Sequence, residues 1–451
     1  MSGRSPAPYS EDARQLVHIA MGGFALLLRY VHWYQAVILA GAAVGFNMWI
    51  LRAATRGRLH RPSESPAGIA PGIVFYPTSI LLLLLLIPSR PDIVAAAWGI
   101  MAAGDGAATL IGRRAGGPRL PWNRAKSVAG TAAFVIAGSA AGVFLAWWCR
   151  PAVIPPPYVW FAVAGPIAGC LVAAAVETVP IKLDDNLSVP LSAALVMWPV
   201  SLINEDLAAA AAHHATDRLL LALAANAAVA AIGYALKTVS VSGAVAGLVI
   251  GCTIFLFSGV EGWLLLLAAF AAASGASRVG LRKKAALGIA EDRGGRRGVG
   301  NAVANTGVAA VAAIASGLTY AEDAALIAFA AALTAGASDT IASEIGKAWG
   351  RRTWLLAPVR RVPAGTPGAL SVEGTAAGLV GALGLAAAAF ALGLIPREAM
   401  VPIVAAATLA SFIESGLGAT LERDGTLNND ALNFVNTGIA AFAALMITGA
   451  I

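Results

Sequence analysis

Two aspartates lie inside apolar stretches that are otherwise typical of membrane-spanning helices. Asp105 lies in GDGAATLIG and Asp339 in ASDTIASEIG, and each is followed at the same offset by Ile-Gly. A lone carboxylate within a bilayer costs on the order of 3 kcal/mol, so it normally faces a cavity and has a partner. A structural hydrogen bond to a neighbouring helix is the alternative explanation. A hydroxyl follows each Asp four residues later on the same helical face, at Thr109 and Ser343, which favours a functional pair.

The same series of polar motifs follows each Asp. A cationic loop comes first, then SVxGTAA, a span outward, a span that returns and ends in Glu, and an acid-amide cluster that opens the last span. Carboxylates that converge with cations suit a divalent metal bridging phosphate oxygens. The acidic and amide candidates are Asp105, Glu177, Asp184, Asp185 and Asn186 in the first series, and Asp339, Glu344, Glu414, Asn429 and Asp430 in the second.

Basic and hydroxyl residues between these acids are candidates for contact with nucleotide phosphates. Phosphoryl transfer needs mainly positioning and electrostatic stabilisation from a protein, and N–H groups at a helix start can contribute. The sequence contains no Walker A, kinase glycine-rich, GxSxG or paired HxxxH motif, so it indicates an unconventional phosphotransferase whose acceptor lies in the bilayer. The candidates are Arg113, Arg114, Lys126, Ser127, Lys347, Arg360, Arg361, Gly365, Thr366 and Ser371, with Arg14 and His18 at the mouth of the first span.

The composition requires membrane helices to carry these groups. Of 451 residues, 58% are hydrophobic and 12% charged, whereas soluble domains contain about a quarter charged residues. A span needs roughly 20 apolar residues, and the chain has about fifteen candidates. No cleavable signal pattern is present, so we expect the first helix to be retained. The fold class predicted is all-α and polytopic, integral to the cell (inner) membrane.

Membrane topology explains the net charge of +7 better than nucleic-acid binding does. With a cytoplasmic N-terminus, most cations, including the basic loop RAATRGRLHRP, fall on the cytoplasmic side, as the positive-inside rule requires. The three cysteines lack paired spacing, which argues against disulfides or zinc. His213, His214 and Asp217 could bind metal, but adjacent helical positions diverge by about 100°, so a solvated linker is favoured. The cations placed outside are Arg29, Arg90, Arg150, Arg218 and Arg397.

The two series define two halves of the chain. An even number of expected crossings separates the two Asp-bearing spans, so the halves have the same orientation and form a parallel repeat. The predicted boundaries are 10–204 for the first membrane domain, 205–237 for a linker and connecting span, and 238–451 for the second. A turn at GVEG is expected between two spans of the second half.

Each half resembles a known membrane family. RQLVHIAMGG, GDGAATLIGRRAG, LPWNRAKSVAGT and VETVPIKLDDNLSVPL are similar to the phytol kinase and dolichol kinase family, although Gln15 replaces a Lys that is frequent there. GGRRGVGNAVAN, ASDTIASEIG, RRVPAGTPGALSVEGT and ESGLGATLERDGTLNNDALNFVNT resemble the membrane family that contains plant phytyl-phosphate kinase. The resemblance implies a fusion that converts a long isoprenoid alcohol to its monophosphate and then its diphosphate.

The resemblance also implies co-substrates and roles. The phosphate donor would be CTP or another nucleoside triphosphate, with Mg²⁺ or a similar cation, and the acceptor a lipid-soluble alcohol such as phytol or geranylgeraniol. Asp105, Asp184 and Asp185 would hold metal or act on the hydroxyl with Glu177, and Asp339, Glu344, Glu414 and Asp430 would take the acidic roles in the second half. A membrane cytidylyltransferase of the CDP-lipid type and a repeat-built transporter are the alternatives.

Overall fold

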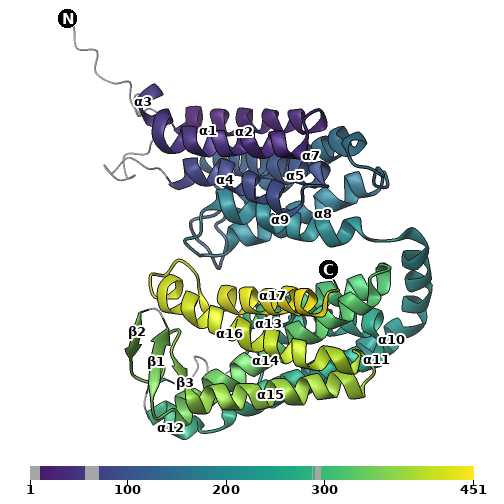
Figure 1. Ribbon diagram of the computed structural model, residues 1–451, viewed down its shortest axis with the longest axis vertical. Helices are drawn as coiled ribbons and strands as arrows, with labels where there is room; N and C mark the ends of the chain where they lie inside the picture. Colours follow the sequence, from purple (N-terminus) through teal and green to yellow (C-terminus); the bar gives the residue numbers. More distant parts are fainter. Residues whose placement is uncertain (1–10, 56–70, 287, 290–295, 357, 451) are drawn as a thin grey trace, which may run out of the picture. The chain divides into compact units, whose positions relative to one another are not determined.

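The computed structural model describes residues 11–55, 71–286, 288–289, 296–356 and 358–450 (Figure 1). Nearly all regular structure there is helical, which confirms a polytopic helical membrane protein. The chain divides into two compact units, Met1–Ser201 and Leu202–Ile451, and each has its own apolar core. Most of the basic loop RAATRGRLHRP and part of the loop after α12 lie outside the described residues.

The first unit is built from helices that surround one central span. That span is α5 (Pro91–Gly99), continued by the π-helical turn η3 (Ile100–Asp105) and by α6 (Gly106–Ala115), and it is the most deeply buried of this unit's long spans. The surrounding helices are α1 (Glu11–Met21) with η1 (Gly22–Arg29), α2 (Trp33–Gly45) with η2 (Phe46–Ile50) and α3 (Leu51–Ala54), α4 (Pro71–Leu86), α7 (Val128–Cys149) with η4 (Arg150–Ala152), α8 (Phe161–Thr178) and α9 (Asp185–Ser201).

The second unit also surrounds a central helix that carries an Asp. This helix is α14 (Glu322–Trp349), in which alanines from Ala330 to Ala332 are fully buried, so that neighbouring helices approach closely. Its neighbours are α10 (Glu205–Ala235), α11 (Val241–Arg278), α12 (Leu281–Ala286), α13 (Val299–Leu318), α15 (Val372–Ala391), η6 (Arg397–Ala399) with α16 (Met400–Leu417) and η7 (Gly418–Glu422), and α17 (Asn429–Thr448).

A small sheet interrupts the otherwise helical second unit, which sequence reasoning did not predict. Its strands are β1 (Thr353–Leu356), β2 (Val359–Arg361) and β3 (Leu370–Ser371), in the order β2-β1-β3. Both pairings are antiparallel, with Leu355 opposite Arg360 and Trp354 opposite Leu370. The sheet forms the loop between α14 and α15.

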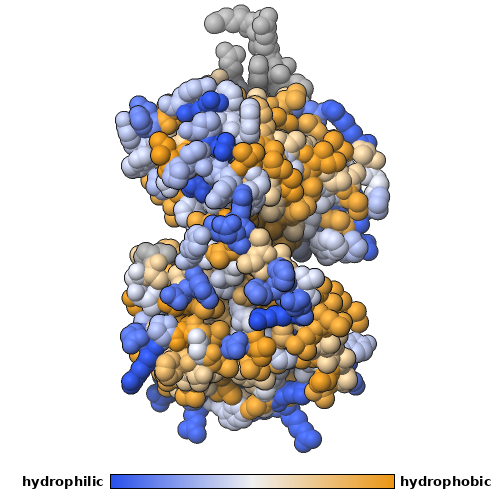
Figure 2. Space-filling view, turned by 90° about the vertical axis from the view of Figure 1, so that its right-hand side faces the viewer, coloured by the Kyte–Doolittle hydropathy of each residue, from blue (hydrophilic) through white to orange (hydrophobic). Residues whose placement is uncertain are grey.

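Eleven helices among the described residues are long and apolar enough to cross a membrane. The predicted count of about fifteen is not reproduced by this criterion, because α1, α4 and α9 are too short for it and α11 contains two of the expected spans. α11 breaks at Gly259, where φ is 70°, and this break lies at the expected GVEG turn. Apolar residues cover much of the surface in Figure 2, as expected for helices that face lipid.

The linker and connecting span predicted at 205–237 are almost entirely one helix in the structure. α10 begins after Asn204, whose side chain accepts from the N–H groups of Asp206 and Leu207, and it continues without a break to Ala235. The alanine-rich composition of its first turns favours this continuous helix. His213 and His214 lie exposed on this helix, and they form no metal cluster with other described residues.

Candidate active site

Asp105 lies where the hydrogen-bond pattern of its span changes. The π-helical turn η3 ends at Asp105, and α6 resumes at Gly106. Such turns are frequent at functional sites. A Cβ at Gly104 would lie 3.1 Å from the Phe134 ring, and one at Gly106 would lie 2.4 Å from the Ile19 side chain. Glycine at these two positions lets α7 and α1 pack closely on both sides of Asp105.

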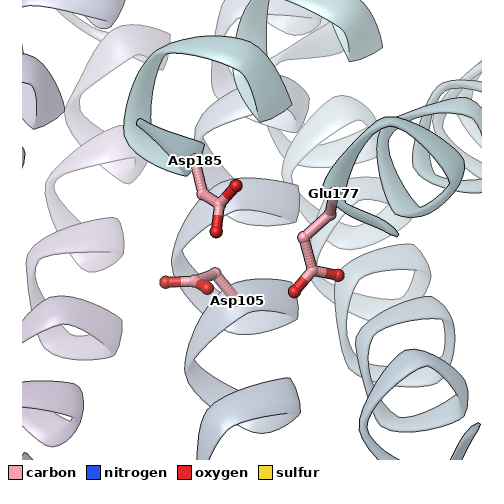
Figure 3. A group of neighbouring side chains, drawn as sticks. All are labelled: Asp105, Glu177 and Asp185. Carbon is pink, nitrogen blue, oxygen red and sulfur yellow. The ribbon is translucent and has the colours of Figure 1, made fainter. Parts of the chain in front are cut away.

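Two further carboxylates converge on Asp105 from the end of α8 and the start of α9 (Figure 3). One oxygen from each of Asp105, Glu177 and Asp185 lies within 4.8 Å of the other two. Glu177 is buried, whereas Asp105 and Asp185 are partly exposed. The structure therefore brings together three of the acids that the sequence singled out, and we call them the acidic triad.

Lys126 contacts two members of the acidic triad from the loop between α6 and α7. Its Nζ donates to Glu177 Oε1 at 2.7 Å and to Asp185 Oδ2 at 3.1 Å. Burial alone would lower the pKa of Lys126, but the carboxylates of Asp185 and Glu177 outweigh this effect and raise it. The amine therefore remains a cation, and it reduces the repulsion between the carboxylates.

His18 borders the acidic triad on the side of α1. Its Nε2 lies 3.7 Å from Asp105 Oδ2 and 3.3 Å from the carbonyl oxygen of Met101. The ring makes an edge contact with Tyr76, at 4.7 Å between centroids. The Tyr76 hydroxyl donates to the His18 carbonyl at 3.1 Å and accepts from Trp98 Nε1 at 2.9 Å. The imidazole is thus held beside Asp105 by helices α4 and α5.

Asp184, Arg14 and Asn186 gather at the first turn of α4, next to the acidic triad. A Cβ at Gly72 would lie within 3.4 Å of polar side-chain atoms of all three. Asp184 Oδ1 accepts from the backbone N–H and the side-chain Nδ2 of Asn186, each at 2.9 Å, so this carboxylate stabilises the start of α9. Its predicted metal role stays a prediction, because Asp184 is outside the group whose oxygens converge.

The other predicted phosphate contacts of the first half occupy different places. Arg113 and Arg114 are more than half exposed and pair with Asp12, at 3.6 and 2.9 Å. Ser127 is buried, and its hydroxyl oxygen accepts from the Gly130 N–H at 3.1 Å, which caps α7. Arg113 and Arg114 could turn toward a nucleotide, whereas the Ser127 oxygen already has a structural partner.

The second unit has a cavity of about 450 Å³ around Asp339 and Glu414. Ser411 donates to Asp339 Oδ1 at 2.9 Å, and the Glu414 carboxyl adjoins that of Asp339. Glu414 Oε2 is buried without a hydrogen-bond partner in the described part of the chain. Lys347, Asn429, Gly365, Thr366 and Ser371 also line this cavity, so seven of the predicted residues meet there.

Glu344 lies apart from this cavity in a buried ion cluster. Lys284 and Lys347 both donate to its carboxylate, and the Lys347 contact is 2.8 Å long. Glu344 and Lys284 are almost completely buried. Since both carboxylate oxygens have ammonium partners, this arrangement is that of a structural ion pair, and we do not assign Glu344 to the metal site.

Three more predicted residues of the second half lie outside the cavity lining. Arg360 and Arg361 are exposed on β2, where Arg361 lies over the Trp354 ring at 5.9 Å. Asp430 packs on α13, where a Cβ at Gly300 would lie 2.1 Å from the Asp430 Oδ2. Asn429 lines the cavity instead. The position that Asp185 occupies in the first series is therefore filled by an amide in the second.

The loop that leads into α15 closes one side of the cavity. Gly365 and Gly368 have φ of 86° and 71°, a conformation that favours glycine, and Thr366 lies between them. A Cβ at Gly368 would lie 2.5 Å from the Ser415 carbonyl oxygen, so the loop runs directly over α16. Ser371 then caps α15 by accepting from the Gly374 N–H at 3.0 Å.

The SVxG sequences make equivalent contacts in the two units. In each unit, the serine hydroxyl oxygen accepts from the backbone N–H of the glycine three residues later and so caps the helix. The same glycine packs on the Asp-bearing span, at the residue three positions after the Asp. A Cβ at Gly130 would lie 3.1 Å from the Ala108 carbonyl oxygen, and one at Gly374 would lie 2.4 Å from that of Ala342. In both units the serine thus caps its helix, and the glycine three residues later brings that helix close to the Asp-bearing span.

Sequence reasoning missed several polar residues of the second cavity. Ser411, Asn301, Asn433 and Glu422 all line it. Ser411 stands one helical turn before Glu414 in SFIES, which places it on the same face, and this spacing could have identified it. Asn301 and Asn433 come from helices whose packing the sequence does not reveal.

Known proteins resemble the chain over parts of its length. A family model described as integral membrane protein DUF92 matches residues 224–441. An "Uncharacterized membrane protein" of Synechocystis sp. is 38% identical over 204 residues, which cover 44% of this chain and 78% of that protein. "Protein VTE6, chloroplastic" of Arabidopsis thaliana is 36% identical over 217 residues, covering 46% and 65% of the two chains.

A relative with a named activity is "Probable phytol kinase 3, chloroplastic" of Glycine max. It is 32% identical over 195 residues, which cover 41% of this chain and 61% of that protein. The matches to VTE6 and to this kinase thus each span less than two thirds of the relative. No solved structure matches the chain.

Proposed function

We propose that this chain, which belongs to the integral membrane protein family DUF92, is a two-site membrane phosphotransferase. It would convert a long-chain isoprenoid alcohol to the monophosphate in the first unit and the monophosphate to the diphosphate in the second. The observation that supports this most directly is the acidic triad with Lys126, set in apolar helices. The relative named a phytol kinase supports kinase chemistry on an isoprenoid acceptor.

The residues of both units suit a hard divalent cation such as Mg²⁺. The acidic triad offers three carboxylate oxygens within 4.8 Å of one another, and oxygen ligands are those that Mg²⁺ prefers. In the second unit, the unpaired Oε2 of Glu414 beside Asp339 leaves a buried acceptor for such an ion. The cation, when bound, would neutralise charge on the triphosphate of CTP or another nucleoside triphosphate.

In the first unit, the alcohol oxygen would attack the γ-phosphorus while the bond to the β,γ-bridging oxygen breaks. The hydroxyl proton would pass to the Asp105 carboxylate, and the nucleoside diphosphate would leave. Lys126, displaced from Glu177 and Asp185, would turn its ammonium to the phosphate oxygens. Positioning and charge stabilisation of this kind suffice for phosphoryl transfer.

In the second unit, the acceptor would already carry a phosphate, and the cavity around Asp339 combines its carboxylates with Lys347 and Asn429. Asn429 stands where the first series has Asp185, which removes one negative charge from the surroundings of an anionic acceptor. Lys347 would balance the acceptor phosphate from the cavity wall. The phosphate oxygen would attack the γ-phosphorus and again release a nucleoside diphosphate.

The test uses purified protein in liposomes with labelled CTP, Mg²⁺ and geranylgeraniol. Asp105→Asn should lower alcohol phosphorylation by roughly 10²–10⁴-fold, the contribution typical of a positioned base, and leave use of the monophosphate intact. Asp339→Asn should let monophosphate accumulate.

Two results would contradict the proposal. Loss of both steps in each variant would refute independent sites, and a lipid that retains the nucleotide would indicate a cytidylyltransferase. Solute uptake that does not depend on nucleotide would support a transporter instead.

A further inference from the structure

An apolar cavity of about 550 Å³ adjoins the acidic triad in the first unit. Helices α1, η1, α2, α4 and α5 line it, and nearly all of the lining side chains are hydrocarbon. The polar lining lies near the start of α4, at Arg14, His18, Asn47 and Asn186. The cavity therefore has one polar end and a long apolar body.

The apolar body extends along α4 and closes at its far end. Gly72 and Leu84 both line it and are twelve residues apart, or about 18 Å at 1.5 Å per residue. Half of a hydrocarbon core of about 30 Å is shorter than this. Leu28, Ala36 and Leu84, at the far end, are each at most 5% exposed. The cavity is thus a closed-ended channel about as deep as one leaflet.

One side of the cavity opens toward the lipid. Phe24 and Leu27 on η1, Leu39 on α2 and Phe46 at the start of η2 line the cavity and are also exposed on the outer surface. η1 packs on α5, and α2 packs on α4, so these exposed apolar side chains flank the cavity from two helices of the first unit. A molecule dissolved in the bilayer could enter there without leaving the membrane.

The polar end of the cavity reaches the acids through His18. His18 lines the cavity, and its Nε2 lies 3.7 Å from Asp105 Oδ2. A chain with a terminal hydroxyl would place that hydroxyl beside Asp105 when its tail fills the apolar body. Such a molecule has the chemistry of an unsaturated or branched long-chain alcohol, which matches methyl-bearing walls of Leu, Ile and Val.

We propose that this cavity holds the tail of the isoprenoid alcohol, which enters sideways between η1 and α2, and that Ala36 and Leu84 limit its length. The inference rests on the proposed function and specifies the acceptor site. Ala36 is the small residue at the closed end, and Leu84 is the large one. Their sizes set the depth of the channel.

The second unit also has an apolar cavity near its acidic site, but a much smaller one. The second unit contains an apolar cavity of about 120 Å³ between α10, α11, α13 and α14. Asn301 lines both this cavity and the one around Asp339. Its volume is below the roughly 300–1,000 Å³ of ligand pockets, so the channel assignment rests on the cavity of the first unit.

The test compares acceptor length in two variants of opposite effect. Ala36→Phe should lower kcat/KM for geranylgeraniol by at least about tenfold relative to geraniol, since small volume changes in apolar pockets discriminate to that extent. Leu84→Ala should raise the use of a longer polyprenol relative to geranylgeraniol severalfold. Ala140→Phe, on an exposed face of α7 away from the cavity, is the matched control and should leave both ratios unchanged.

Photo-crosslinking separates failure of the inference from failure of the proposed function. A diazirine analogue of geranylgeraniol, without nucleotide, should label η1 and α2, and Ala36→Phe should abolish that labelling. An active wild-type protein whose length ratios are the same in all three variants would overturn the channel assignment. A wild-type protein that is labelled on η1 and α2 but phosphorylates no alcohol would refute the kinase and retain the channel.

Discussion

Lys126 determines how the acidic triad is neutralised. Because its pKa is raised, the amine stays charged over the whole pH range in which a membrane enzyme works. In the structure it holds Glu177 and Asp185 together at 2.7 and 3.1 Å. A divalent cation bound to these carboxylates would displace the ammonium, and we expect it then to turn toward the triphosphate of the proposed donor. One residue can therefore stabilise the empty site and contact the donor in the loaded one.

We predict that Lys126→Met lowers kcat/KM for the nucleotide by roughly 10²-fold, the loss typical when one charge-stabilising group is removed. Lys126→Arg should retain most of the activity, because the charge is kept although the geometry changes. Initial rates at fixed alcohol and varied CTP measure both effects. A methionine variant within threefold of wild type would show that the amine has only a structural role.

The ion cluster of Glu344 makes a different prediction, on stability. Lys284→Met leaves the Glu344 carboxylate buried with one partner fewer, and breaking a buried pair costs roughly 3–5 kcal/mol. The melting temperature in detergent should therefore fall strongly. The double variant Lys284→Met/Glu344→Leu should recover much of the loss, because no acid then remains buried.

If the double variant is as unstable as the single one, the lysine stabilises the fold through packing of its stem. If Glu344→Gln abolishes phosphorylation of the monophosphate without changing the melting temperature, the predicted metal role of Glu344 would be supported after all.

At the scale of elements, the contact between the Asp-bearing span and the following helix recurs in both units. The glycine of SVxG packs on a carbonyl oxygen of the Asp-bearing helix, at 3.1 Å for a Cβ on Gly130 and 2.4 Å for one on Gly374. A Cβ at 2.4 Å from a backbone oxygen forces the helices apart, whereas one at 3.1 Å needs a small adjustment.

We predict that Gly374→Ala destabilises the protein more than Gly130→Ala does, and that it also lowers the second phosphorylation, since α15 borders the cavity around Asp339. Thermal unfolding in detergent and the ratio of monophosphate to diphosphate measure the two effects. Gly384→Ala, where a Cβ meets nothing within 4 Å, is the matched control in the same helix. Equal stability of all three variants would contradict the packing argument.

Much of the site could be predicted because membrane topology constrains where polar groups lie. The predicted topology puts Asp105, Glu177 and Asp185 toward the same side of the membrane, because apolar spans leave few positions for acids. The break of α11 at GVEG could also be predicted, because glycine permits the positive φ found at Gly259. The π-helical turn at Asp105 could not be predicted, because it depends on how Phe134 packs against Gly104.

Other features depend on tertiary contacts that no sequence spacing encodes. The resemblance suggested that Asp430 acts at the second site, but the start of α17 directs Asn429 into the cavity and Asp430 toward α13. The sequence predicts phosphate contacts at Ser127 and Ser371, and in the structure both hydroxyls cap a helix through the same Ser-x-x-Gly spacing. A capping motif and a phosphate-binding loop share residue types, so only the partner of the hydroxyl distinguishes them.

At the scale of the molecule, the two acidic sites belong to separate compact units with separate cores. Each unit has its own Asp-bearing central helix and its own adjoining apolar cavity. If the two steps proceed as proposed, the isoprenyl monophosphate must leave the first unit before the second can act on it. The opening of the channel between η1 and α2 gives this intermediate access to the bilayer.

We therefore predict that two full-length variants, each with one inactive site, complement each other through the membrane. Asp105→Asn and Asp339→Asn proteins, reconstituted in the same liposomes with geranylgeraniol and CTP, should form diphosphate, because monophosphate made by the second variant diffuses in the bilayer to the first. The same proteins in separate liposomes should form far less, since a long isoprenyl tail leaves a membrane reluctantly. Thin-layer separation of the labelled lipids measures both cases. Diphosphate formation by wild type together with none in the shared liposomes would mean that the intermediate passes only between the two units of one chain.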